Sequence, residues 1–181
     1  LSLHAPTLFF LQGLWGRDAW VKIERTIEIA KALDVPTIVA HPPFRWQGKY
    51  ARGFVEGVAR LEDEHGIAIA VENMYPWRTP VGRLMAYLPH WDPTGLEHQY
   101  LTLDLSHAST AQASSRDYAR AWGPKLRHVH FTDGNGSFKD EHLFPGEGSQ
   151  QAWELLDDLQ QYGYDGQIVL EVNSRKAGNR A

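Results

Sequence analysis

The stretch Ile67-Ala68-Ile69-Ala70-Val71-Glu72 is an unbroken apolar run that ends in a carboxylate. A short apolar run without a polar interruption is typical of a strand that is covered on both faces of a sheet. A helical pattern over residues 50–65 precedes it, and Gly66 is suited to end that helix in the left-handed conformation. We therefore predict a helix followed by a buried strand of a parallel sheet.

The same pattern, an apolar run that ends in an ionisable residue, recurs along the chain. The five other runs are LSLH ending at His4, TIVAH at His41, YLTLD at Asp104, LRHVH at His130 and IVLE at Glu171. Successive end residues lie 26 to 41 positions apart, and a strand–helix–strand unit needs about 30. We expect helices between these strands over residues 18–33, 50–65, 80–90, 114–122 and 150–162.

This alternation predicts an α/β fold, a (β/α)8 TIM barrel that forms a single domain over residues 1–181. One further short strand is expected over residues 141–144. A complete barrel of this type usually has about 250 residues. We therefore interpret the chain as an incomplete barrel that lacks the first βα unit and the last helix.

The composition is that of an ordinary globular protein, with 43% hydrophobic and 22% charged residues. Lys and Arg number 18 against 22 Asp and Glu, which disfavours a general nucleic-acid binder without excluding nucleic acid. No apolar run approaches the ~20 residues of a membrane span, and no secretory signal is visible. The absence of cysteine excludes disulfides and cysteine-type zinc sites. We expect a cytoplasmic protein without a membrane partner, and its oligomeric state stays open.

The run ends predict a metal site, because the carboxyl ends of parallel strands converge at one face of a barrel. Several carboxylates at such a mouth would repel one another unless a cation lay among them. Imidazole and carboxylate ligands together suit Zn²⁺, Mn²⁺ or Fe²⁺ better than Ca²⁺ or Mg²⁺. The residues expected there are His4, His41, Glu72, Asp104, His130 and Glu171, with His107, Asp140 and His142 just beyond strand ends.

The motifs around these residues resemble those of the xylose-isomerase-like TIM barrel superfamily, also described as AP endonuclease family 2. This superfamily contains sugar and sugar-phosphate isomerases and epimerases, and endonuclease IV. The resemblance covers nearly the whole chain and depends on the order and spacing of the motifs together. They are HAP at His4, VAHPP at His41, VENM at Glu72, LDLSHA at Asp104, HVHFTD at His130, DEH at Asp140 and VLEVN at Glu171.

The isomerase and epimerase branch implies one divalent metal, usually Mn²⁺, Mg²⁺ or Co²⁺. The metal ligands that this resemblance implies are Glu72, Asp104, His130 and Glu171. Glu72 and Glu171 would also be catalytic, exchanging a proton at the carbon next to a carbonyl as base and acid. His107 would bind the substrate, which we expect to be a small sugar, polyol or sugar phosphate. This is our first hypothesis for the function.

The endonuclease IV branch implies three zinc ions instead, which activate a hydroxide against a phosphodiester in abasic DNA or another phosphoester. Their ligands by resemblance are His4, His41 and Glu72, then Glu72, Asp104, His130 and Glu171, and finally His107, Asp140 and His142. Met74-Tyr75-Pro76-Trp77 and Ser109-Thr110-Ala111 stand where that branch carries DNA-facing loops. This is therefore the second hypothesis, and a non-catalytic sugar- or metal-binding barrel is the third.

Further substrate-binding residues are expected in the loops that follow the strand ends. Trp15, Trp46 and Trp77 are predicted to form an apolar wall under a sugar ring, and Arg78 to bind a phosphate or carboxylate. His128 shares a strand face with His130 one layer deeper, so we interpret it as a core residue. We expect the loop residue His98 to be solvated.

Overall fold

A parallel sheet forms the centre of the computed structural model, which describes residues 1–7, 14–79, 81–137 and 139–174. Each strand is hydrogen-bonded to the next strand of this sheet along the chain, and every pair is parallel. Six consecutive strands in sequence order are what a (β/α)8 barrel produces, so the predicted fold class is confirmed. The strands are β1 (Leu3–His4), β2 (Thr37–Ala40), β3 (Ala68–Glu72), β6 (Leu101–Asp104), β7 (Leu126–Phe131) and β8 (Gln167–Leu170).

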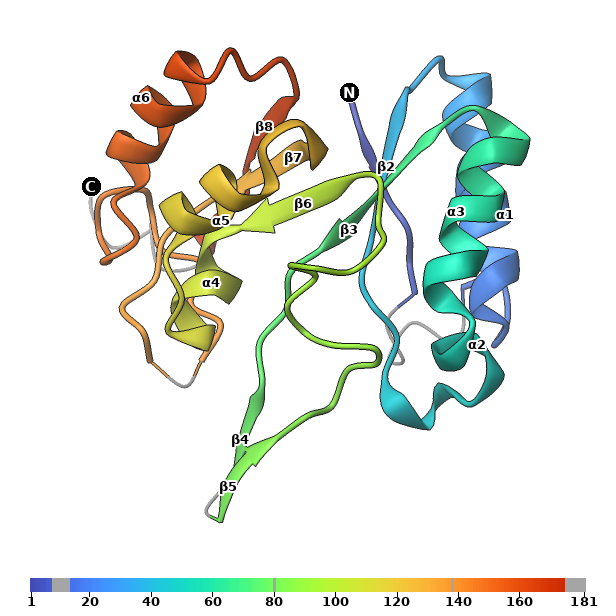
Figure 1. Cartoon of the computed structure of the whole chain (residues 1–181), viewed down its shortest axis with the longest axis horizontal. Helices are drawn as coiled ribbons and strands as arrows, with labels where there is room; N and C mark the ends of the chain where they lie inside the picture. The colour runs from blue at the N-terminus through green and yellow to red at the C-terminus, as the bar shows by residue number, and fades with distance from the viewer. Residues whose placement is uncertain (8–13, 80, 138, 175–181) are drawn as a thin grey trace.

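Helices connect these strands and cover the sheet, with α1 and α3 on one flank and α5 and α6 on the other (Figure 1). Asp18 caps α1 through the backbone N–H of Trp20, and Gly66 ends α3 with a φ of 63°, as predicted. No helix among the described residues is long and apolar enough to cross a membrane. The helices are α1 (Ala19–Ala32), α2 (Lys49–Arg52), α3 (Phe54–His65), α4 (Leu105–Ala111), α5 (Ser115–Trp122) and α6 (Ala152–Gln161), with 3-10 turns η2 (Arg45–Gln47) and η3 (Gly123–Lys125).

The hydrophobic core lies between the sheet and these helices. Side chains of α1, α3 and α5 pack onto the central strands, which are buried along their whole length in β2, β3 and β6, and α6 packs on α5. The edge strand β8 differs, because Ile168, Val169 and Leu170 remain 40–58% exposed. The residues that are buried most completely include Ile23, Ile27, Ile38, Phe54, Leu61, Ile69, Leu103 and Leu155.

The helix predicted over residues 80–90 is wrong. Antiparallel strands β4 (Trp77–Thr79) and β5 (Gly82–Leu84) form a hairpin there, and it extends away from the body of the molecule (Figure 1). Gly82 has a φ of 137°, which no helix accommodates. Tyr87 then bridges to Phe44, so this segment is attached to the loop after β2.

The short strand predicted over residues 141–144 is also wrong. The backbones of Leu143 and Asp133 form an isolated β-bridge. Among the described residues of 141–144, this bridge does not extend into a strand. The backbone of His142 has a φ of 44°, and this left-handed conformation interrupts an extended chain. The segment is a loop that carries Asp140 and His142.

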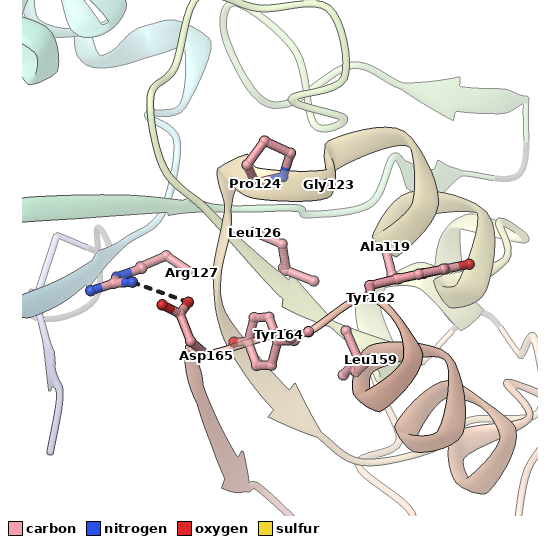
Figure 2. A pocket seen from close by; sticks show the side chains of 10 residues that line it. Ala119, Gly123, Pro124, Leu126, Arg127, Leu159, Tyr162, Tyr164 and Asp165 are labelled. Atoms are coloured by element: carbon pink, nitrogen blue, oxygen red, sulfur yellow. Dashed lines mark hydrogen bonds and ion pairs between the residues drawn. The ribbon is translucent and has the colours of Figure 1, made fainter.

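A cavity of about 460 Å³ lies between α5, η3, β7 and α6 (Figure 2). Arg127, the second residue of β7, forms an ion pair of 3.5 Å with Asp165 at its edge. The hydroxyl of Tyr164 donates to the backbone carbonyl of Gln167 across 2.9 Å. This cavity is at the amino-terminal end of β7, opposite the strand ends that carry the ionisable residues.

His98 is buried rather than solvated, so that expectation is wrong. Its side chain is 3% exposed and packs edge-on against the ring of Phe54, with the ring centroids 5.8 Å apart. Neither ring nitrogen has a hydrogen-bond partner among the described residues. Burial, with a smaller repulsion from Lys125, lowers the pKa of His98 to about 4. The folded protein therefore holds a neutral imidazole here.

Replacing His98 with Phe should remove one source of acid lability. Between pH 6.5 and 4 the unfolded chain binds a proton that the folded His98 rejects, so stability falls as the pH falls through this window. The full effect is about 3 kcal/mol in the free energy of unfolding. Urea denaturation of the two proteins across pH 4–7.5 measures the difference.

The variant His98→Gln is the control, because it removes the titration but keeps a buried polar side chain. In both variants the fall in the free energy of unfolding that His98 causes between pH 6.5 and 4 should disappear. Only His98→Phe should also be more stable than the wild type at neutral pH. An unchanged pH dependence in His98→Phe would contradict the assignment.

Candidate metal centre

Nine ionisable side chains converge where the strands end. His4, Glu72 and Asp104 are the last residues of β1, β3 and β6, and His41 and Glu171 directly follow β2 and β8. The remaining four come from β7, from α4 and from the loop after β7, and they are His130, His107, Asp140 and His142. The structure thus brings together all the residues that the sequence predicts as metal ligands.

Glu72 is the centre of this cluster, and its side chain is 1% exposed. Its Oε2 lies 3.2 Å from Nε2 of His4 and 3.0 Å from Nε2 of His41. Its Oε1 lies 3.0 Å from Nδ1 of His107 and 3.3 Å from Nδ1 of His130. Four imidazoles from four different segments therefore surround one buried carboxylate.

His130 joins Glu72 to two further carboxylates. Its Nδ1 lies 2.9 Å from Oε2 of Glu171 and 3.4 Å from Oδ2 of Asp104. Asp104 is fully buried, whereas the side chain of Glu171 is 47% exposed. One imidazole nitrogen is thus shared by three carboxylates that differ widely in their access to solvent.

Asp140 organises the second part of the cluster. Its Oδ2 lies 2.9 Å from Nε2 of His142 and 3.2 Å from Nε2 of His107. Because His107 also contacts Glu72 through its other nitrogen, this imidazole links the two parts.

Asn73 positions Asp104, and sequence reasoning missed it. Its side-chain oxygen accepts from the backbone N–H of Asp104 at 2.7 Å, and its amide donates to the backbone carbonyl of Asp104 at 3.0 Å. Asp104 in turn caps α4 by accepting from the backbone N–H of His107. The D-x-x-H spacing of Asp104 and His107 was a usable signal for this cap, and Asn73 had no comparable signal.

The protonation states follow from the mixture of burial and opposite charge. Burial opposes charging of these groups, but the neighbouring imidazoles outweigh it and hold the pKa of Glu72 well below its usual range. The carboxylates likewise outweigh burial at the imidazoles, raising the pKa of His130 to about 12 and that of His142 to about 9. The pKa of His107 is raised well above its ordinary value. Without a cation, these three imidazoles are therefore protonated at neutral pH.

The donor atoms fit a divalent cation. Three groups each place their ligand atoms within 4.8 Å of one another, and they are His4–Glu72–His130, Asp104–His107–His142 and Asp104–His130–Glu171. Oδ2 of Asp104 and Nδ1 of His130 are buried without a hydrogen bond of acceptable geometry. Nitrogen and oxygen donors in this mixture are the set that Zn²⁺ and Mn²⁺ accept.

The orientation of three imidazoles supports the same interpretation. Nδ1 faces a backbone carbonyl in each: Ala5 at 3.3 Å for His4, Asn73 at 2.9 Å for His107 and Glu171 at 3.1 Å for His142. Each Nε2 faces a carboxylate of the cluster. A histidine that ligates a metal usually donates its other N–H in this way.

A cavity of about 320 Å³ opens above the cluster. Glu72 and Glu171 line it, while Asp104 and His130 lie beneath and are not among its lining residues. Its other side is aromatic and apolar. The lining residues on that side are Phe44, Met74, Tyr75, Trp77 and Tyr87.

Of the predicted substrate-binding loop residues, one lines the cavity, one extends its aromatic side and two lie outside its lining. Trp77 lines the cavity. Trp46 is 52% exposed and extends the aromatic side outward, stacked on Phe44 at 4.7 Å with an angle of 6°. Arg78 in β4 and the half-buried Trp15 do not line the cavity.

His128 is a core residue, as predicted. It is 1% exposed, and its Nε2 lies 2.8 Å from Oγ of Ser2.

Residues 1–181 match the xylose isomerase-like TIM barrel family. The chain belongs to this family. An uncharacterized protein of Mycobacterium tuberculosis (strain ATCC 25618 / H37Rv) is 41% identical over 196 residues, which cover 98% of this chain and 70% of that protein. Fructoselysine 3-epimerase of Escherichia coli O157:H7 is 42% identical over 50 residues, or 28% of this chain and 18% of the enzyme.

Solved structures of the family share the fold at low sequence identity. A crystal structure of the IOLI protein, described as having a zinc atom bound, superposes with a TM-score of 0.60 at 18% identity. The match covers 94% of this chain and 65% of that one. A xylose isomerase-like TIM barrel/4-hydroxyphenylpyruvate dioxygenase fusion protein gives the same TM-score at 16% identity, over 94% of this chain and 28% of that one.

Binding of Zn²⁺ to the metal-free protein at pH 7 should release protons. Imidazole binds a metal in its neutral form, and His130 and His142 hold their protons up to pH values near 12 and 9. We expect on the order of one proton for each imidazole that becomes a ligand. Calorimetric titration with zinc chloride in two buffers of different ionisation enthalpy counts them.

The variant His142→Gln should release one proton fewer if His142 becomes a ligand. If the heats of zinc binding were equal in the two buffers, no protons would be released, and this would contradict the prediction.

Proposed function

We propose that the protein is a divalent-metal-dependent isomerase or epimerase that acts on a sugar, a polyol or a sugar phosphate. The observation that carries this proposal is the position of two glutamates. Glu72 and Glu171 line the same cavity, and both reach Nδ1 of His130, at 3.3 and 2.9 Å. Two carboxylates beside one cavity can act as base and acid on the two faces of a substrate carbon.

Glu72, Asp104, His130 and Glu171 would hold the ion in this proposal. The bound ion would supply Lewis acidity, polarising the carbonyl and hydroxyl oxygens of the substrate. Zn²⁺ or Mn²⁺ suits the ligand set, and Co²⁺ and Mg²⁺ are the further candidates.

The two glutamates differ in ways that suit different roles. Glu171 is half-exposed and hydrogen-bonding by His130 lowers its pKa, so it is ionised and can accept a proton from a substrate in the cavity. Glu72 is buried among four imidazoles at the base of the cluster and would act on the opposite face of the substrate carbon. His107 lines the cavity between Glu72 and Asp140 and would position a substrate hydroxyl.

The aromatic side of the cavity suits the apolar face of a sugar. Trp77 and Phe44 would contact a ring bound above the cluster, and Trp46 would extend this contact outward. Arg78 and Trp15 lie outside the cavity lining, so we assign them a role only with a substrate that extends beyond it. The partial similarity to fructoselysine 3-epimerase supports a sugar-derived substrate.

Changing Glu171 or Glu72 to Gln should abolish proton exchange at the reacting carbon. Loss of a general base or acid typically costs ~10²–10⁴-fold in rate. The measurement is exchange of substrate C–H hydrogen with tritiated water, over a panel of ketoses, aldoses and their phosphates. Metal content is measured on the same samples, because both residues are proposed ligands.

Glu154→Gln, on the exposed side of α6, is the matched control and should exchange at the wild-type rate. Proton exchange retained in both Glu72→Gln and Glu171→Gln would contradict the proposal. Tight sugar binding without exchange in the wild type would instead favour a non-catalytic binding barrel.

A zinc phosphodiesterase similar to endonuclease IV is the second candidate. The observation that favours it is the part of the cluster around Asp140, since Oδ2 of Asp140 contacts both His107 and His142 beyond the ligands of a one-ion site. His4 and His41 on Glu72 add a third set. Three zinc ions in one site would neutralise a phosphodiester and activate hydroxide.

Elemental analysis of the purified protein separates the two candidates. The phosphodiesterase requires about three zinc ions per chain and cleavage of a duplex that contains an abasic site. About one ion per chain without such cleavage favours the isomerase or epimerase. A chain without divalent metal after zinc loading would contradict both.

A further inference from the structure

Ser106 lies between Asp104 and His107 and is fully buried. Its hydroxyl donates to Oδ1 of Asp140 at 2.6 Å. It also accepts from the backbone N–H groups of Glu141 and His142, each at 3.0 Å. A serine hydroxyl has one donor and two acceptor positions. All three are used, and all three act on one three-residue segment.

This segment needs an external support, because it has little regular structure of its own. In the described part of its loop, Leu143 forms one β-bridge with Asp133, and the carbonyl of His142 accepts from the backbone N–H of Asn173 at 2.8 Å. The left-handed backbone of His142 is also costly for a residue other than glycine and has to be stabilised by its surroundings. The contacts of Ser106 lie directly at this position.

Ser106 also determines which oxygen of Asp140 is available. Oδ1 is occupied by the serine hydroxyl. Oδ2 is left to face Nε2 of His107 and Nε2 of His142. Without the hydroxyl, the carboxylate could rotate and the two imidazoles would lose a fixed partner.

Two other residues of α4 hold the same loop, but at different points. Ser109 accepts from the backbone N–H of Gly136 at 2.7 Å, and the hydroxyl of Thr110 donates to the carbonyl of Lys139 at 3.1 Å. Neither contacts a proposed metal ligand through these bonds. Ser109 is buried like Ser106, so the chain offers a matched control on the same helix.

We propose that Ser106 is a positioning residue that fixes Asp140 and His142 as one unit against α4 and presents them, with His107, to a divalent cation. Only the second half of the proposal rests on a proposed metal site, that of the second candidate function above, in which His107, Asp140 and His142 hold an ion of their own. The positioning itself is a property of the metal-free protein, so the two are tested separately.

The first test uses metal-free protein labelled with ¹⁵N in histidine. Ser106→Ala should move the imidazole ¹⁵N signals of His107 and His142, while Ser109→Ala leaves both in place. The signals of His4 and His41 should be unchanged in both variants. Equal shifts in the two serine variants, or none in Ser106→Ala, would overturn the positioning role whatever the enzyme does.

The second test uses Co²⁺, titrated by its visible absorption and checked by elemental analysis. In Ser106→Ala, the affinity of the proposed site at Asp140 and His142 for Co²⁺ should fall by roughly 10- to 100-fold, as it usually does when a metal ligand loses its supporting hydrogen-bond partner. Ser109→Ala should bind as the wild type. Unchanged Co²⁺ binding and spectrum in Ser106→Ala, together with the shifts in the first test, would overturn the metal-presenting half alone.

A third measurement covers a Ser106→Ala variant that fails to fold. The backbone N–H groups of Glu141 and His142 donate to Ser106 in the wild type, so their amide hydrogens should exchange with D₂O slowly. Rapid exchange of both amides in the folded wild type would overturn the proposal without any variant.

Discussion

A carboxylate buried to 1% exposure at the end of β3 is the constraint on which the rest of this site depends. An isolated buried carboxylate is so costly that the group would take up a proton and become neutral, or the chain would not fold around it. Glu72 avoids this because imidazoles from β1, the loop after β2, α4 and β7 all reach its two oxygens. The arrangement of the strands therefore supplies the positive charge that the buried carboxylate needs.

The same arrangement produces a gradient of access from one side of the cluster to the other. Asp104 and His130 are held beneath the cavity, while Glu171 and His4 are open to it. Groups below the cavity can hold an ion in a fixed position, and groups at its surface can reach a substrate.

The sequence was sufficient to predict the sheet and the nine clustered residues, because parallel strands convert a repeated pattern into a common location. It failed where local signals conflicted. The pattern over residues 80–90 was helical, but Gly82 takes a φ of 137° and a hairpin forms. His98 was expected in solvent because it lies in a loop, yet Phe54 covers it. The role of Ser106 depends on a loop 34 residues away, which no local pattern reveals.

His107 links the two parts of the cluster, and its orientation bears on how far the metal centre extends. Its Nδ1 lies 2.9 Å from the carbonyl of Asn73, so in the neutral form of this imidazole Nδ1 is the nitrogen that keeps its hydrogen. Nε2 is then the nitrogen that can bind a cation, and it faces Asp140 rather than Glu72. His142 repeats this orientation on the other side of the same carboxylate oxygen. The two imidazoles thus present the same nitrogen to one oxygen of Asp140, and this contact joins the loop after β7 to the rest of the cluster.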